Sequence, residues 1–157
     1  MPYLATELFM METGTRMVHI PYKGSGPAGI GILSGETQLL FAAILSVLPT
    51  VKAGRLRPIA VTAPKRNALV PEIPTLSESG LPGFDTATWY GTFAPAKTPR
   101  ELVIKLNEDF VKAIRSPEVR SNLEQQGYGV EGSSPEDLAR LVKSDLVKWS
   151  RVIRSIK

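Results

Sequence analysis

The segment 22–28, with the sequence YKGSGPA, has the residue types and spacing of a loop that could hold an anion. Gly24 and Gly26 allow a ligand to approach the backbone closely, and a helix is expected to follow them. Free amides and the positive end of that helix's dipole would attract an anion, and Lys23 and Ser25 could add a charge and a hydroxyl. The alternative, in which the glycines only form a tight turn between a strand and a helix, remains open at this point.

Two further segments could contribute to a ligand site, although packing is the simpler interpretation of both. An apolar run over 37–44 ends in small side chains that leave backbone amides accessible, at Ala42, Ala43 and Ser46. An aromatic cluster on an expected extended segment comprises Trp89, Tyr90 and Thr92. Aromatic side chains usually pack, but at a junction between two lobes they could line a cleft.

The composition argues against an enzyme and against a bound metal or cofactor. The chain has no cysteine and one histidine, His19, which excludes thiolate chemistry, disulfides and Cys-ligated zinc. His19 lies between apolar neighbours on an expected strand, where packing is its expected role. Lys23 is the one imaginable Schiff-base lysine, but nothing in the sequence indicates the desolvation that it would need. Glu78 and Glu101 are explained by helix starts, so no two carboxylates are placed for acid–base catalysis.

The length and charge of the chain fit one ordinary globular domain. It has 157 residues and a formal net charge of +4, from 19 basic and 15 acidic side chains. The basic surplus lies in the C-terminal half and is spread along helical faces without interleaved aromatics, so nucleic-acid binding is not expected. No apolar run is long enough to span a membrane, and the first residues, MPYLATELFMMETG, do not have the pattern of an export signal.

In the first half of the chain, short apolar runs alternate with helical patterns, which is typical of βα units. Strands are expected at 16–22, 37–44 and 55–63. Helices are expected at 3–11, 27–35 and 46–53, with Pro27 at the first position of the second one. The continuous apolar character of the second strand predicts that both of its faces are covered.

The second half is predicted to be mainly helical. Thr75 and Glu78 have the spacing of a capping box before a stop at Gly80, and an extended segment over 84–96 follows. Helices are expected at 99–115, 117–127 and 135–157, opened by Thr98-Pro99, Ser116-Pro117 and Ser134-Pro135. The apolar stripe of the last helix needs something to pack on, and the three or four expected strands offer little. A piece of the fold is therefore expected to lie outside this chain.

Four stretches of the chain resemble the Bug/TctC family, the extracytoplasmic solute receptors of tripartite tricarboxylate transporters. They are HIPYKGSGPAGIGILSGETQLLF, LPTVKAGRLRPIAVTAPKRNALVPEIPTLSESGLPGF, TWYGTFAPAKTP and EGSSPEDLARLVKSDLVKWSRVI. Together they cover essentially the whole chain in the family's order. The chain is similar to the C-terminal half of full-length members and has no counterpart of their signal peptide and first lobe.

The fold that this resemblance implies is α/β, of the type II periplasmic-binding-protein kind. Residues 1–90 would form the ligand-binding second lobe, a three-layer structure with a mixed sheet. Residues 91–157 would form the crossing segment and the C-terminal helices, which pack on the first lobe of an intact receptor. That arrangement would explain the unpartnered stripe of the last helix.

The function that the resemblance implies is a periplasmic receptor that captures a small carboxylate and delivers it to the membrane components of a transporter, without a cofactor. The residues that would face the ligand in the family's loop motif are Tyr22, Lys23, Gly24, Ser25, Gly26, Pro27 and Ala28. Family members often have Asp where this chain has Ala42, so a plain or aromatic carboxylate is expected rather than an amine-bearing ligand. The alternative is a stand-alone anion-binding or oligomerising module, and a homodimer through the exposed lobe interface is a further expectation.

Overall fold

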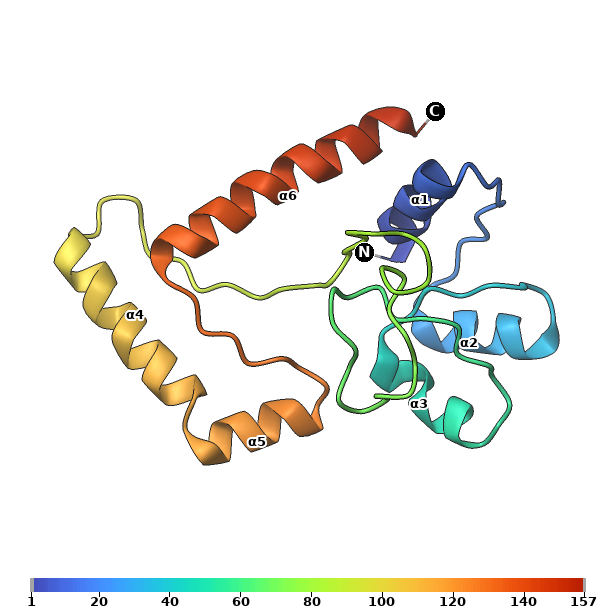
Figure 1. Ribbon diagram of the computed structural model, residues 1–157, viewed down its shortest axis with the longest axis horizontal. Helices are drawn as coiled ribbons and strands as arrows, with labels where there is room; N and C mark the ends of the chain where they lie inside the picture. The colour runs from blue at the N-terminus through green and yellow to red at the C-terminus, as the bar shows by residue number, and fades with distance from the viewer. Residues whose placement is uncertain (1, 157) are drawn as a thin grey trace. The chain divides into compact units, whose positions relative to one another are not determined.

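The computed structural model describes residues 2–156, which form the helices α1 to α6 and one isolated β-bridge (Figure 1). The chain divides into two compact units. The first runs through Ala87 and includes Ile156, and the second spans Thr88–Ser155. The sequence places a division near residue 90, close to the boundary between these units.

The first unit contains three helices, α1 (Pro2–Thr13), α2 (Ser25–Ser34) and α3 (Ile44–Lys52). All three were expected, but α2 and α3 each begin two residues before the predicted start. Pro27 is the third residue of α2 rather than the first, which the helix tolerates because first-turn N–H groups have no partner inside the helix. The start of α3 includes Ile44, which packs with Leu48 against the core of this unit.

The predicted sheet is absent from residues 2–156. The expected strands at 16–22, 37–44 and 55–63 have no regular strand structure apart from one parallel bridge between Val61 and Thr75. Beside that bridge, the Val61 N–H donates a hydrogen bond of 2.8 Å to the Pro74 carbonyl oxygen. The prediction of three paired strands is therefore wrong for the chain by itself.

The physical reason is that a strand needs a neighbouring strand to complete its backbone hydrogen bonds. The described chain brings no such neighbour to the first two segments. Side chains that a sheet would cover are consequently exposed, with 86% of Val18, 40% of Leu39 and 62% of Ile59 accessible. The double-sided burial expected of 37–44 is also wrong, since Ala42 and Ala43 are exposed.

The core of the first unit lies where α3 meets the segment after the bridge. Val61, Val70 and Ile73 form a buried cluster, and the partly buried Ile44 and Leu48 of α3 pack against it. Aromatic rings form a second contact, because Phe9 of α1 lies 5.8 Å from Phe41 and 6.4 Å from the buried Phe84 between ring centroids. These contacts hold α1 and α3 in one unit with the segment 61–84.

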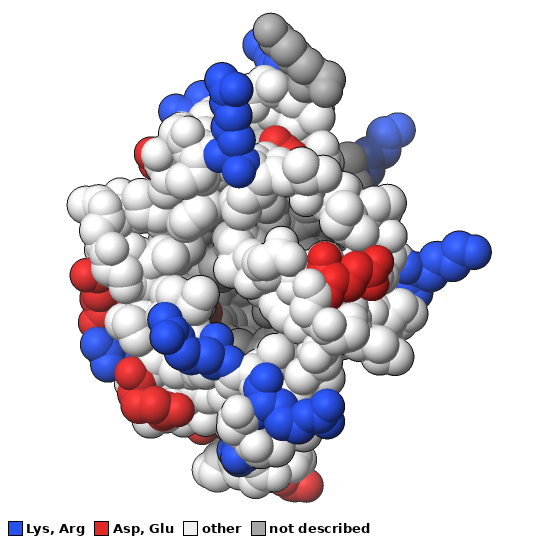
Figure 2. Space-filling view, turned by 90° about the vertical axis from the view of Figure 1, so that its right-hand side faces the viewer, with Lys and Arg blue, Asp and Glu red and all other residues white. Residues whose placement is uncertain are grey.

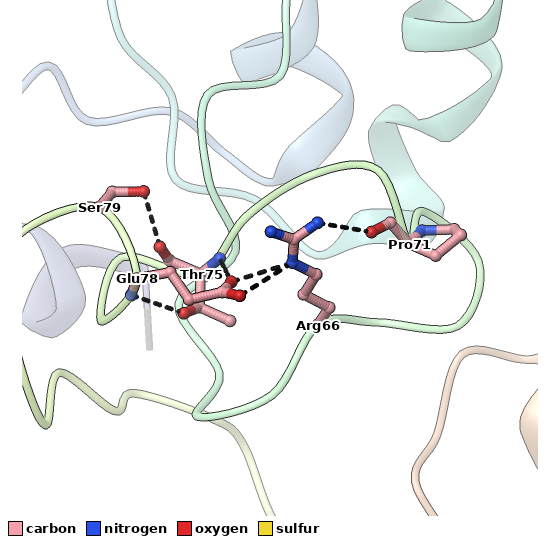
Figure 3. Close-up of polar contacts among 5 residues, drawn as sticks. All are labelled: Arg66, Pro71, Thr75, Glu78 and Ser79. Carbon is pink, nitrogen blue, oxygen red and sulfur yellow. Dashed lines mark hydrogen bonds and ion pairs between the residues drawn. The ribbon is translucent and has the colours of Figure 1, made fainter.

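The expected capping box at Thr75 and Glu78 forms (Figure 3). The Thr75 N–H donates to Glu78 Oε2 at 2.7 Å, and the Glu78 N–H donates to Thr75 Oγ1 at 3.0 Å. Arg66 Nε donates to both carboxylate oxygens of Glu78 at 3.1 and 3.0 Å, and its Nη1 donates to the Pro71 carbonyl. The turn that follows ends at Gly80, which has φ of 106°, where the sequence predicts a stop.

The second unit contains α4 (Arg100–Ile114), α5 (Pro117–Gln125) and α6 (Pro135–Ser155), as the sequence predicts. Their caps differ from one another. The Asp137 N–H donates to Ser134 Oγ at 3.1 Å at the start of α6, whereas no side chain caps α4 or α5. Thr98 is therefore not the cap that was predicted.

Charged side chains do not gather into one patch on the face that Figure 2 shows, where lysines and arginines are separated by acidic and uncharged residues.

No helix of the described residues is both long and apolar enough to cross a membrane. The ring centroid of His19 lies 4.6 Å from that of Tyr3, but the residue is exposed and the strand expected around it is absent.

Candidate functional site

The loop before α2 has the geometry that the sequence suggests for an anion site. Gly24 is the N-cap residue, with φ of 112° and ψ of 177°, a region that is essentially restricted to glycine. Ala28 donates the first helical hydrogen bond, 3.4 Å to the Gly24 carbonyl. The amides of Ser25 and Gly26 therefore precede the helical hydrogen-bond pattern, and no side chain caps them.

The charges around this helix start favour an anion. The first turn of α2 contains no acidic residue, and Lys23 is exposed directly before it. Ser25 and Gly26 are exposed as well, and no side chain caps the amides at this helix start. Pro27 has no N–H and adds no donor. Two amides, one hydroxyl and the positive helix terminus are the groups that this loop offers to a carboxylate.

Tyr22 is held against the middle of α2. A Cβ atom built on Gly31 would lie 2.2 Å from Tyr22 Oη and 2.6 Å from Cζ, so a side chain at this position would displace the ring. The hydroxyl oxygen is shielded from solvent and has no hydrogen bond of normal geometry within the described residues. Burial raises the pKa of the Tyr22 phenol, and the neighbouring Glu36 carboxylate raises it further, while a contact with Thr37 acts in the opposite direction.

Helices α2 and α3 contact each other. Figure 1 shows both helices beginning at the same end of the first unit, with the segment after α2 running back to that end. Ala43 is the N-cap residue of α3, and no side chain caps the first turn, which contains no acidic residue. The Ser46 hydroxyl donates to the Ala43 carbonyl at 2.7 Å. Ala42 and Ala43 therefore leave a second open helix start, whereas the hydroxyl proton of Ser46 is engaged locally.

Trp89 belongs to the second unit and has a well-defined structural role there. Its indole Nε1 donates to Asp145 Oδ2 at 2.7 Å, and Lys148 Nζ lies 2.8 Å from Asp145 Oδ1. The indole also packs on Gly91, where an added Cβ would lie 3.2 Å from Cζ3. Desolvation of the Asp145 carboxyl opposes ionisation, but Lys148 and the indole N–H together hold the pKa of that carboxyl below its usual range. Tyr90 stacks edge-on with Tyr128, at 5.7 Å between centroids.

Sequence reasoning missed the residues that support the loop. Gly31, Glu36 and Thr37 were not singled out, although a glycine inside a helical pattern is a known sign of close packing. The Thr37 N–H donates to the Gly31 carbonyl at 3.3 Å, so the chain after α2 returns to the same glycine that Tyr22 covers. Within the described residues, no group of three or more His, Cys, Asp or Glu side chains could hold a metal ion.

Comparison with known proteins gives a family match over nearly the whole chain. The model of the tripartite tricarboxylate transporter family receptor matches residues 2–157. A protein encoded in the tcbD–tcbE intergenic region of Pseudomonas sp. strain P51 is 38% identical over 96% of this chain and 45% of its own length. Protein BugT of Bordetella pertussis is 31% identical over 97% of this chain and 47% of its own length. The chain thus spans about half the length of these relatives.

One relative is nearly as short as this chain. The protein from the clcB–clcD intergenic region of Pseudomonas knackmussii is 30% identical over 96% of this chain, and the match covers 90% of that relative.

Three solved structures share the fold over about half of their length. The R. palustris protein Rpa4515 with adipate has a TM-score of 0.75 and 35% identity, covering 98% of this chain and 51% of that protein. MatC from Rhodopseudomonas palustris with bound malate has a TM-score of 0.69 and 31% identity, over 97% and 53%. The periplasmic binding protein BugD has a TM-score of 0.71 and 28% identity, over 98% and 52%.

Proposed function

This chain belongs to the tripartite tricarboxylate transporter receptor family, and we propose that it binds a small carboxylate as part of an extracytoplasmic solute receptor. The observation that carries the proposal is the loop at Gly24, which leaves two backbone amides and the Ser25 hydroxyl open at a helix start. The structures with adipate and malate support a carboxylate ligand. The periplasmic binding protein BugD supports a place of action outside the cytoplasmic membrane.

The mechanism of this proposal is reversible binding rather than catalysis. The two oxygens of a carboxylate would accept hydrogen bonds from the Ser25 and Gly26 amides, and the Ser25 hydroxyl would add a third donor. The dipole of α2 and the exposed charge of Lys23 both favour an anion at this position. Delivery to membrane components of a transporter follows from the family and is part of the same proposal.

In the intact receptor, we propose that the first unit is the α/β second lobe. The segments around Val18, Leu39 and Ile59 would complete a mixed sheet there, which would cover the side chains that the chain leaves exposed by itself. The C-terminal helices would pack on the first lobe.

Calorimetric titration of the full chain with adipate tests the binding site. Ser25→Ala removes only the hydroxyl, whereas Ser25→Pro also removes an amide at the first helical position, where proline is well tolerated. Each hydrogen bond to a charged group contributes about 1.5–3 kcal/mol, so Ser25→Pro is expected to weaken binding about 10- to 100-fold relative to Ser25→Ala.

Ser116→Ala is the matched control, because Ser116 precedes α5 in the other unit and should leave the affinity unchanged. Equal affinity of Ser25→Pro and the wild type would refute the site, and no binding of adipate or malate would refute the function.

The ligand class is tested with malate and aspartate, which are four-carbon dicarboxylates that differ in a hydroxyl or an ammonium group. Because Ala42 supplies no carboxylate for an ammonium group, malate is expected to bind more tightly. Tighter binding of aspartate would contradict this part of the proposal.

A second candidate function is a stand-alone module that associates with itself. The short relative from P. knackmussii favours it, since a chain of this extent occurs there over 90% of a protein's length. Large exposed apolar side chains, including Val18 and Ile59, would then be covered by a second copy. Sedimentation analysis distinguishes the candidates: a defined dimer without adipate binding would favour the module, and adipate binding by a monomer would favour the receptor.

A further inference from the structure

Tyr22 lies at a point where three parts of the first unit meet. Its ring covers Gly31 in the middle of α2, on which a Cβ atom would come within 2.2 Å of the hydroxyl oxygen and 3.1 Å of Cε1. The segment that follows α2 reaches the same place, because the Thr37 N–H donates to the Gly31 carbonyl at 3.3 Å. The chain before the helix and the chain after it are thus both attached to one glycine.

The Tyr22 hydroxyl is not available to a ligand in this arrangement. The oxygen is shielded from solvent and has no hydrogen bond of normal geometry within the described residues, although Glu36 and Thr37 are its neighbours. A buried polar atom without a partner lowers stability, so the hydroxyl does not explain the contact. The ring explains it, because it fills the space above Gly31.

The position of this contact relates it to the proposed anion loop. Tyr22 precedes Gly24 by two residues, and Gly24 has a backbone conformation that a free loop would leave readily. Gly24 and Gly26 have no atom within 4 Å of an added Cβ, so packing at these glycines does not hold the loop in place. The ring of Tyr22, two residues before Gly24, ties the chain before the loop to Gly31 of α2.

We propose that Tyr22 is a positioning residue, whose ring, packed on Gly31, holds the Ser25 and Gly26 amides in the orientation that binds a carboxylate. This inference rests on the proposed function, and it assigns Tyr22 a role other than direct ligand contact. Preorganised donors bind more tightly because less conformational entropy is lost when the ligand binds.

Three variants test the proposal through adipate affinity. Tyr22→Phe keeps the ring and should bind within about twofold of the wild type. Tyr22→Ala removes the ring and should weaken binding about tenfold, which corresponds to about 1.4 kcal/mol. Gly31→Ala displaces the ring and should cause a similar loss of adipate affinity. The double variant Tyr22→Ala/Gly31→Ala should bind adipate no more weakly than Tyr22→Ala, because the two changes act on one contact.

A second readout requires no ligand. Backbone 15N order parameters of Gly24, Ser25 and Gly26 should be near the rigid value of about 0.85 in the wild type and in Tyr22→Phe. They should fall toward about 0.6 in Tyr22→Ala. Val70→Ala is the matched control, because it removes packing from the buried cluster of the same unit without touching the loop, and it should change neither the order parameters nor the affinity.

The outcomes separate the two proposals. Unchanged order parameters and affinity in Tyr22→Ala would overturn the positioning role, and so would an equal effect of Val70→Ala. Weak adipate binding by Tyr22→Phe would show that the hydroxyl itself contacts the ligand. That result would also overturn the positioning role. If Ser25→Pro binds adipate as tightly as the wild type, the binding site fails, whereas the order parameters still decide whether Tyr22 holds the loop.

Discussion

Alanine substitutions at two nearby glycines, Gly24 and Gly29, should have opposite effects on stability, although both sites have open space for a new methyl group. An added Cβ has nothing within 4 Å at Gly24 or at Gly29, so packing is the same in both cases. Gly24 has φ of 112° and ψ of 177°, where an L-residue is strained by about 1–3 kcal/mol. Gly29 lies inside α2, where alanine is favoured over glycine by about 0.8–1 kcal/mol.

We therefore expect the free energy of unfolding to fall by about 1–3 kcal/mol in Gly24→Ala and to rise by up to about 1 kcal/mol in Gly29→Ala. Urea unfolding followed by far-UV circular dichroism measures both values. Tryptophan fluorescence is a poor probe for this purpose, because Trp89 and Trp149 both belong to the other unit. If Gly24→Ala is as stable as Gly29→Ala, the loop does not have the left-handed conformation on which the anion site depends.

Two further predictions concern polar contacts away from the loop. The hydrogen bond from Arg66 and the capping bond from Thr75 hold the pKa of the Glu78 carboxyl below its usual range. A lowered pKa in the folded state stabilises the protein above the unfolded-state pKa of about 4.3, and this contribution disappears as the pH falls through the folded-state pKa. The stability difference between the wild type and Glu78→Gln should accordingly shrink as the pH falls below about 4.3. A difference that stays constant with pH would contradict the ion pair. In the second unit, Trp89→Phe removes the hydrogen-bond donor to Asp145 and should lower the free energy of unfolding by about 1–3 kcal/mol. Urea titration followed by Trp149 fluorescence measures this change. An unchanged unfolding midpoint would show that the hydrogen bond contributes nothing to stability.

Local signals in the sequence predicted the helices well. Helix starts depend on a few adjacent residues, and the proline positions at Pro117 and Pro135 gave the first residues of α5 and α6. The capping box at Thr75 and Glu78 was also predicted, because its partners are three residues apart. The predicted start of α2 at Pro27 was wrong for a reason that is also local. Gly24 is the N-cap residue, so the helix begins at Ser25.

Burial along the helices was predicted less completely. Val152 on the predicted apolar face of α6 is fully buried, and the basic residues Arg140, Lys143, Arg151 and Arg154 are exposed, as expected. Leu141, on the same predicted face, is nevertheless 38% exposed. Periodicity indicates which residues share a face, whereas burial depends on which surface covers that face.

The sequence by itself determined the helix positions, the family and the loop that could hold an anion, since each depends on residues close together in the chain. Only the tertiary structure decided that the expected strands remain unpaired within residues 2–156, because a sheet requires neighbours that are distant in sequence. It likewise decided the contact between Tyr22 and Gly31. They lie nine positions apart, and no periodicity predicts that an aromatic ring will occupy the space that a missing Cβ leaves on a helix.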